Sequence, residues 1–224
     1  MAIQVEVWGD YALFSAPEFS TERLTYDVIT PSAARGILEA VFFHPGMRFV
    51  IDRIHVLNPI EFASIRRNEV SKKISASNVL AAAKGGDKQL FLATSQSIQQ
   101  RAAVVLKNVR YMIEAHFEMT DKATEADNPG KFQAMLKRRL SRGQSYHQPY
   151  LGTREFPARF RLWEGGVINA IQETRDLGFM LLDFDYRNPE DIKPIFFRAK
   201  MVQGVISPPD PVAWLRNNGG GVIL

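Results

Sequence analysis

Four histidines, His44, His55, His116 and His147, are the strongest candidates for acid–base chemistry in this chain of 224 residues. An unperturbed imidazole titrates near neutral pH, so it can take up or release a proton during a reaction. No two of the four have the i, i+4 spacing that would place them together on a helix as metal ligands. Cysteine is absent, which excludes a thiol nucleophile and a thiolate zinc site. We therefore expect neither a metal nor another cofactor.

The common catalytic signatures are also missing. The sequence contains no GxxxxGK[ST], no HExxH, no GxSxG and no GxGxxG after a strand. Nucleotide hydrolysis, zinc proteolysis and hydrolase-type serine catalysis therefore lack their usual residues.

His116 lies in a stretch whose residues alternate in the manner of a strand. Tyr111, Ile113, Ala115 and Phe117 would share one face, and His116 would lie on the other face with Met112, Glu114 and Glu118. One interpretation is an exposed histidine on a polar face. The other is a general acid or base beside RNA, which would take the proton from a ribose 2′-hydroxyl or protonate the leaving 5′-oxygen.

The positive charge is concentrated in two segments, although the net charge is only +4. Residues 131–161 contain eight Lys or Arg and one acidic residue, and residues 64–88 contain six and two. The first thirty residues, in contrast, have a net charge of −4. Such segregation favours a polyanionic partner over charge that serves solubility.

Single-stranded RNA is bound by basic side chains that contact phosphates and by aromatic rings that stack on bases. Tyr146 and Tyr150 lie beside the larger basic segment and are candidates for stacking. The residues expected to bind RNA are Arg35, Arg66, Arg67, Lys72, Lys73, Lys137, Arg138, Arg139, Arg142, Tyr146 and Arg154.

The hydrophobic pattern predicts the order β-α-β twice, separated by a polar, basic stretch. Thr30-Pro31 is a typical helix start, and Asn128-Pro129 is a second one. Period-2 alternation indicates the strands. The expected elements are strands near 3–7, within 49–57, at 101–119 and at 155–163, and helices at 31–43 and 131–142.

This order predicts an α+β fold with a ferredoxin-like, RNA-recognition-motif-like domain at residues 1–164. The polar stretch at about 60–100 is expected to be a basic β-hairpin insertion. After Gly165-Gly166 the pattern changes to short strand-like runs. Residues 165–224 are therefore predicted to form a small C-terminal domain with an antiparallel β-sheet.

Several longer segments resemble one known family. They are WGDYALF at 8–14, TPSAARGILEAVFFHP at 30–45, FVIDRIHVLNPI at 49–60, IEAHFE at 113–118, YLGTREFPARF at 150–160 and FFRAKMVQGVI at 196–206. In this order they are similar to the type I-C CRISPR-associated endoribonucleases, the d (Dvulg) branch of the Cas5 proteins. The resemblance runs through almost the whole chain.

The resemblance implies a metal-independent endoribonuclease that cleaves the repeat hairpin of precursor CRISPR RNA. Such enzymes leave a 5′-hydroxyl and a 2′,3′-cyclic phosphate. They then hold the 5′ handle of the mature CRISPR RNA within the type I-C Cascade complex, so other Cascade subunits are expected partners. Duplex DNA is a further ligand that the sequence leaves open. The N-terminus lacks the pattern of a signal peptide and no apolar run is long enough to span a membrane, so a cytoplasmic location is expected.

The family's proposed catalytic set is a tyrosine late in the first helix and a lysine and a histidine in a strand. His116 matches the histidine, but Phe42 occupies the tyrosine position, and no lysine is evident, since Glu114 and Ala115 precede His116. Either another group substitutes, with His44, Tyr26 and His147 as candidates, or cleavage is weak. Phe42 would then be a core residue of an amphipathic helix, and His44 would interact with the helix dipole. The alternative function is a non-catalytic, CRISPR RNA-binding assembly subunit.

Overall fold

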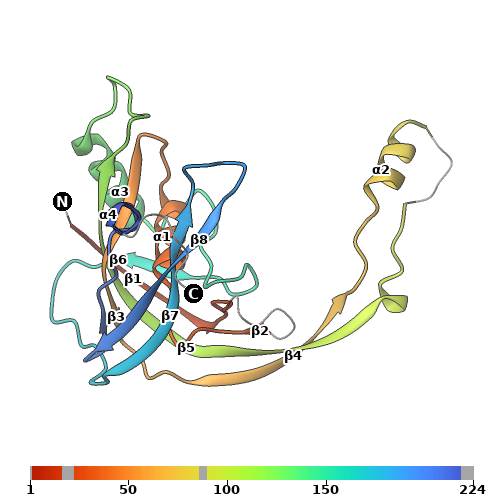
Figure 1. Ribbon diagram of the computed structural model, residues 1–224, viewed down its shortest axis with the longest axis horizontal. Helices are drawn as coiled ribbons and strands as arrows, with labels where there is room; N and C mark the ends of the chain where they lie inside the picture. Colours follow the sequence, from red (N-terminus) through yellow and green to blue (C-terminus); the bar gives the residue numbers. More distant parts are fainter. Residues whose placement is uncertain (1, 17–22, 86–89, 218–224) are drawn as a thin grey trace. The chain divides into compact units, whose positions relative to one another are not determined.

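The computed structural model describes residues 2–16, 23–85 and 90–217. The chain divides into two compact units, with residues 1–63 and 104–224 in unit 1 and residues 64–103 in unit 2. Figure 1 labels the helices and strands in chain order. In the residues described, no helix is long and apolar enough to cross a membrane.

The first βα unit follows the sequence prediction. Strand β1 spans Ile3–Ala12, helix α1 spans Pro31–Val41 and strand β3 spans Met47–Val56. Thr30 caps α1, because its hydroxyl oxygen accepts a hydrogen bond from the Ala33 N–H at 3.2 Å, and Pro31 has no N–H to leave unpaired. The helix ends two residues earlier than predicted, at Val41.

The second βα unit begins with the long strand β5, Ile98–Met119, and continues through helix α3, Pro129–Ser141, to strand β6, Arg159–Leu162. Asn128 caps α3 by accepting from the Lys131 N–H at 2.7 Å. Phe132, Leu136 and Leu140 form the apolar side of α3, and all three are buried. Strand β6 is shorter than the predicted 155–163.

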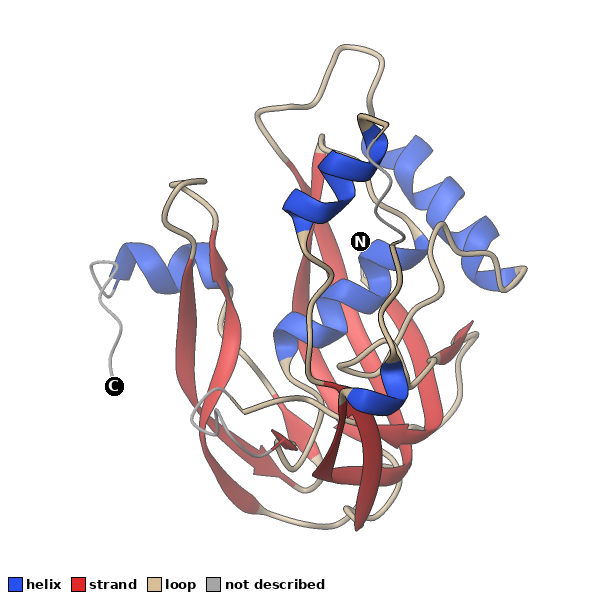
Figure 2. Cartoon of the chain, turned by 90° about the vertical axis from the view of Figure 1, so that its right-hand side faces the viewer, coloured by secondary structure: helices blue, strands red, loops and turns tan. Residues whose placement is uncertain are grey.

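The strands of unit 1 pair in the order β6-β1-β5-β3-β9-β8-β7. Strands β1 and β3 are both antiparallel to β5, which lies between them. Helices α1 and α3 cover one face of this sheet (Figure 2). On this face Phe132 packs against Phe42 and Phe117, with ring centroids 5.9 and 6.4 Å apart. Because neighbouring residues of a strand point to opposite faces, His116 lies on the other face, which α1 and α3 do not cover and which we call the helix-free face.

The C-terminal residues extend the same sheet instead of forming a separate one. Strands β7, Arg175–Asp185, and β8, Lys193–Val202, form an antiparallel pair, and β9, Val205–Ile206, joins β8 to β3. A tight turn at Gln203 and Gly204, with φ of 49° and 74°, brings β9 back against the edge of β3. This pairing places the predicted C-terminal domain inside unit 1. Helix α4, Pro211–Asn217, follows and was not predicted.

Unit 2 contains strand β4, Phe62–Val70, paired with β5. The sequence predicted a hairpin here, but the chain between the two strands also forms helix α2, Ala76–Ala83, and a 3-10 turn at Thr94–Gln96. Ser75 caps α2 by accepting from the Asn78 N–H. In the described part of unit 2 most side chains are exposed, including those of α2.

Candidate functional site

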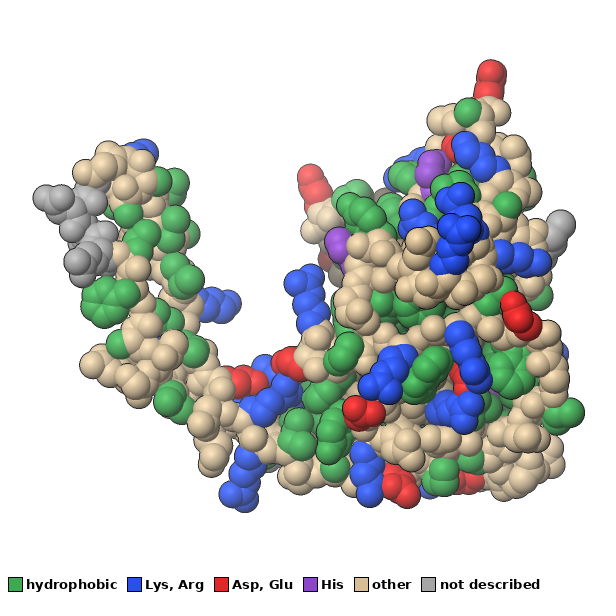
Figure 3. Space-filling view, turned by 180° about the vertical axis from the view of Figure 1, so that it is seen from behind, with side chains coloured by type: hydrophobic (Ala, Val, Ile, Leu, Met, Phe, Trp, Pro, Cys, Tyr) green, Lys and Arg blue, Asp and Glu red, His purple; other side chains and the backbone are tan. Residues whose placement is uncertain are grey.

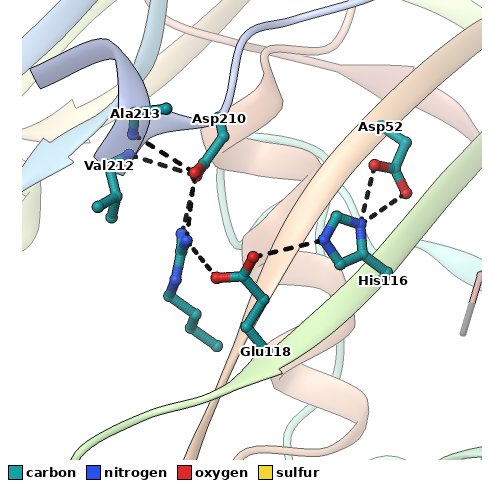
Figure 4. Close-up of polar contacts among 7 residues, drawn as sticks. Asp52, His116, Glu118, Asp210, Val212 and Ala213 are labelled. Carbon is teal, nitrogen blue, oxygen red and sulfur yellow. Dashed lines mark hydrogen bonds and ion pairs between the residues drawn. The ribbon is translucent and has the colours of Figure 1, made fainter. Parts of the chain in front are cut away.

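His116 is held by a carboxylate from the neighbouring strand on the helix-free face. Nδ1 of His116 lies 2.9 and 3.0 Å from the two carboxylate oxygens of Asp52 (Figure 4). Asp52 is brought there by a β-bulge, because the register of β3 against β5 shifts between Ile51 and Arg53. The imidazole is about one third exposed, at 32%. With Nδ1–H donating to Asp52, Nε2 is the ring atom that can exchange a proton.

A second carboxylate links His116 to the C-terminal helix. Oε1 of Glu118 lies 3.8 Å from Nε2 of His116, and Oε2 accepts from Arg48. Arg48 also donates to Asp210 at 2.9 Å, and Asp210 accepts from the Val212 and Ala213 N–H groups at the start of α4 (Figure 4). His116, Glu118, Arg48 and Asp210 thus form one polar chain.

Within this polar chain, the charges of Arg48 and Asp210 stabilise each other. Partial burial disfavours the charge on Arg48, but Asp210 and Glu118 outweigh it and raise the pKa of its guanidinium. Burial would likewise raise the pKa of Asp210, but the hydrogen bonds and charge of Arg48 and the two backbone N–H groups hold it below its usual range. Both groups therefore stay ionised at neutral pH.

A groove lies beside α1, on the opposite side of the sheet from His116. Its volume is about 630 Å³, and its lining includes Phe43, Tyr146, His147, Tyr150 and Arg154. Phe43 and Tyr146 are exposed over 60% and 72% of their surface, which is unusual for large aromatic side chains. Three of the predicted RNA-binding or catalytic residues, Tyr146, His147 and Arg154, are therefore brought together.

The end of α1 fixes one wall of this groove. The carbonyl of Ala40, which has no partner within the helix, accepts from the N–H groups of Tyr146 and His147 at 2.9 and 3.1 Å. The rings of Tyr146 and His147 pack edge to face with centroids 4.4 Å apart. A second groove of about 340 Å³ continues along α1 and shares Gly36, Ala40 and Tyr150 with the first.

The other catalytic candidates lie on the helix-covered side. Phe42 is buried at 3% exposure and packs on Phe132, so it is a core residue. His44 stacks on Phe132 with centroids 4.8 Å apart, and its Nδ1 accepts from the Gly46 N–H at 3.0 Å. Tyr26 is buried in the core. None of these three shares a face of the sheet with His116.

Two of the predicted RNA-binding arginines have partners inside the protein. Arg35 donates to Glu39 and to Asp183, and although burial opposes its charge, these two carboxylates raise its pKa. Arg139 donates to the Val41 carbonyl at 2.6 Å and lies over the ring of Phe42. Arg35 thus joins α1 to β7, and Arg139 binds a backbone carbonyl at the end of α1.

The remaining basic candidates are on the surface. Lys137, Arg138 and Arg142 are exposed along α3, and Arg154 is exposed in the loop before β6. In unit 2, Arg66, Lys72 and Lys73 are exposed and Arg67 is half-buried. Figure 3 shows Lys and Arg side chains interspersed with hydrophobic ones over the face of unit 1 that it displays.

Sequence reasoning missed Asp52 and Phe43. In β3 the apolar residues Phe49 and Ile51 are two apart, and so are Ile54 and Val56, but Ile51 and Ile54 are three apart. This one additional residue is the sequence signal of the bulge that presents Asp52. Phe43 follows Phe42 directly, but Phe42 is buried and Phe43 is 60% exposed. Within the described residues, no group of three or more His, Asp or Glu could hold a metal ion.

The sequence has close relatives among curated proteins. One from Mannheimia succiniciproducens, named CRISPR pre-crRNA endoribonuclease Cas5d, is 48% identical over 214 residues, covering 92% of this chain and 94% of the relative. A protein of the same name from Thermus thermophilus is 39% identical over 224 residues, covering 92% of this chain and 91% of the relative.

Solved structures share the fold at lower identity. A structure described as a CRISPR-associated protein has a TM-score of 0.67 at 22% identity, covering 95% of this chain and 93% of its own. A functionally uncharacterised protein from Streptococcus mutans has a TM-score of 0.66 at 22% identity, covering 93% and 92%. The family model Cas_Cas5d, described as CRISPR-associated protein (Cas_Cas5), matches residues 2–209. The chain therefore belongs to the Cas5d family of CRISPR-associated proteins.

Proposed function

We propose that this protein is a pre-crRNA endoribonuclease that cleaves the repeat of precursor CRISPR RNA in the cytoplasm. Both curated relatives carry this activity in their names, and they match nine tenths of the chain. The structural observation that carries the proposal is the Asp52–His116 pair on the helix-free face, because it presents an oriented, partly exposed imidazole.

In the proposed reaction a ribose 2′-oxygen attacks the adjacent phosphorus atom and the bond to the 5′-oxygen breaks. The 2′-hydroxyl loses a proton and the leaving 5′-oxygen gains one, so the products are a 2′,3′-cyclic phosphate and a 5′-hydroxyl. Nε2 of His116 exchanges one of these protons. Asp52 is a positioning residue, because it holds Nδ1 and so fixes which ring nitrogen faces the RNA. Neither proton transfer requires a metal ion.

RNA binding is assigned to the groove beside α1 and to the exposed face of α3. Tyr146, Phe43 and Tyr150 offer exposed rings for base stacking, and Arg154 offers a phosphate contact in the same groove. Lys137, Arg138 and Arg142 extend the positive surface along α3. The repeat RNA would contact these residues on one side of the sheet and reach His116 on the other.

We also propose that the β1-α1-β3 and β5-α3-β6 segments form a ferredoxin-like domain. Two observations support this assignment. The four strands occur in the spatial order β6-β1-β5-β3, which is the 4-1-3-2 order of a split βαβ arrangement, and every adjacent pair among them is antiparallel. Helices α1 and α3 both pack on one face.

The test of the activity is incubation of the purified protein with its cognate repeat RNA in EDTA. We expect cleavage at one position, a 5′-hydroxyl on the downstream product and a cyclic phosphate on the upstream product. Treatment of the upstream product with acid, which opens a cyclic phosphate, should change its gel mobility. Intact RNA in EDTA, with cleavage restored by Mg²⁺, would contradict the metal-free mechanism.

A non-catalytic assembly subunit is the second candidate function. It is favoured by Phe42 and Ala115, which carry no group able to transfer a proton, and by exposed hydrophobic side chains of unit 2 that suit a protein partner. These are Ile74, Val79, Leu80, Leu90 and Phe91. Tight, salt-sensitive binding of repeat RNA that stays intact with and without Mg²⁺ would establish this second function instead.

A further inference from the structure

The segment WGDYALF has no part in the proposed reaction, yet it opens onto a pocket of the helix-free face. Trp8, Gly9 and Asp10 line this pocket together with Arg110 and Arg161, and its volume is about 300 Å³. Asn58 and Asn108 contribute amide groups at the rim, and Nδ2 of Asn58 donates to the Asn108 carbonyl at 2.8 Å. The pocket therefore combines an indole ring, two guanidinium groups and two amides.

A buried carboxylate aims the two arginines. Glu6 is 1% exposed, and its two oxygens accept separately from Nε of Arg110 and Nε of Arg161. Because each arginine binds Glu6 through Nε, the terminal nitrogens of both remain available as donors. These side chains are 44% and 56% exposed, and among the described residues no second carboxylate pairs with either one.

The strand register adds a third arginine and places Trp8 among them. Trp8 lies directly opposite Arg110 on β5 and opposite Arg159 on β6, so the three side chains project from the same face. The guanidinium of Arg161 lies 5.8 Å from the centre of the Trp8 ring. The four charged residues that line the pocket, Glu6, Asp10, Arg110 and Arg161, sum to zero, and Arg159 on the neighbouring strand adds one positive charge on the same face.

We propose that this pocket is a nucleotide-binding subsite, which holds one unpaired nucleotide of the RNA substrate. The base stacks on Trp8 or on the Arg161 guanidinium beside it, and a phosphate accepts hydrogen bonds from Arg110, Arg159 or Arg161. The inference rests on the proposed RNA substrate and gives the helix-free face a binding role that the groove beside α1 does not supply.

The position of the pocket relative to His116 supports this role. Arg110 and His116 are six residues apart on β5, an even number, so both side chains lie on the same face. At about 3.4 Å per residue they are ~20 Å apart along the strand, a distance that a few nucleotides of extended RNA can span. A nucleotide in the pocket would therefore lie a few nucleotides from the cleaved bond and would take no part in the reaction.

Trp8 provides a direct spectroscopic test. A protein carrying Trp163→Phe, Trp214→Phe and His116→Ala retains Trp8 as its one tryptophan, and the His116→Ala substitution is expected to slow cleavage of the RNA during the measurement. We expect a single-stranded hexaribonucleotide, and then the repeat RNA, to quench its fluorescence, because a stacked base contacts the indole. RNA binding that leaves the fluorescence unchanged would overturn the stacking role.

Affinity measurements test the arginines. In the His116→Ala background, Trp8→Ala should weaken repeat RNA binding about 5- to 150-fold, the range of one lost base stack. Arg161→Gln should lower the slope of log affinity against log salt by about 0.7, as expected for one phosphate contact to a single strand. Trp8→Phe should lose less affinity for repeat RNA than Trp8→Ala. Circular dichroism checks that each variant is folded.

Arg198→Gln is the matched control, since Arg198 is an exposed arginine paired with Asp176 at 2.7 Å on β8. It should leave both affinity and salt slope unchanged. Folded Trp8 and Arg161 variants with the parent's affinity would overturn the subsite while leaving the proposed nuclease function intact. Such a result would mean that the pocket serves another ligand, such as an acidic peptide. Failure of the parent itself to bind RNA would overturn both proposals.

Discussion

Asp52 and His116 lie 64 residues apart in the sequence, yet both carboxylate oxygens of Asp52 are within 3.0 Å of Nδ1 of His116. The pairing joins β3 to β5 and depends on the bulge in β3. A carboxylate on one ring nitrogen leaves the other nitrogen in a defined direction, which is the arrangement that acid–base catalysis by histidine requires. The pair therefore supplies an oriented proton carrier without any contribution from Phe42.

Asp52→Asn should slow cleavage about tenfold to 100-fold and leave the affinity for repeat RNA unchanged. The asparagine can still hydrogen-bond to Nδ1, but it can donate as well as accept and so no longer fixes the ring nitrogen that carries the proton. The measurement is a single-turnover rate as a function of pH, whose profile should change shape. Cleavage by Asp52→Asn at the parent's rate and with the parent's profile would remove the positioning role.

Arg154→Gln should weaken repeat RNA binding severalfold and reduce its salt dependence, because Arg154 is exposed in the groove beside Tyr146. Arg187→Gln is the control, since Arg187 is an exposed arginine bound to Asp185 at 2.6 Å and lies outside the groove. Filter binding at several salt concentrations measures both. Equal losses for the two variants would indicate a general charge effect and argue against a groove contact.

Gly152→Ala should destabilise the protein by more than about 3 kcal/mol. The backbone at Gly152 has φ of 85°, and an added Cβ would lie 1.9 Å from the Leu13 carbonyl oxygen. Gly143→Ala is the matched control, because its φ is 62° but no atom lies within 4 Å of the added Cβ, so it should cost only about 1–2 kcal/mol. Urea unfolding measures the stability of both variants. Similar losses of unfolding free energy in the two would contradict the close packing at Gly152.

Asp210→Asn should reduce the free energy of unfolding at pH 7 by about 1 kcal/mol. The substitution removes the negative charge that pairs with Arg48 and that accepts from the backbone at the start of α4. The pKa of Asp210 is lowered in the folded protein, so its contribution is complete above the unfolded value near pH 4 and is lost as the pH falls through the folded value. The stability difference between parent and variant should therefore disappear on acidification. A difference that does not shrink as the pH falls below about 4 would contradict this linkage.

Elements with strong local signals were predicted well. The hydroxyl and amide caps at Thr30 and Asn128 are short-range features, and each appears where the sequence indicated. Strand β9 and helices α2 and α4 were missed. Two paired residues are too few for a periodic pattern, and α4 follows two prolines and begins with a third, a composition that usually indicates a loop.

The site was predicted less completely because its geometry depends on non-local pairing. Strand alternation correctly assigned His116 to the face opposite Phe117, but nothing local to either residue indicated that Asp52 would reach it. The sequence likewise grouped Arg35 with the RNA-binding arginines, whereas in the fold two carboxylates bind it. Residue type and local pattern predict exposure, but the partner of a charged side chain depends on which strands meet.

The most direct test of the account is the single-turnover cleavage rate of His116→Ala beside that of His55→Gln, on cognate repeat RNA in EDTA. His55 is a suitable control, because it also lies on the helix-free face and faces a carboxylate, Glu114, at 3.0 Å. Because it lacks one general acid or base, the His116→Ala variant should cleave the RNA about 100-fold more slowly or worse and should retain its affinity for RNA. His55→Gln should cleave at the parent's rate. Cleavage by a folded His116→Ala variant at the parent's rate would contradict the assignment of His116 and with it the proposed mechanism.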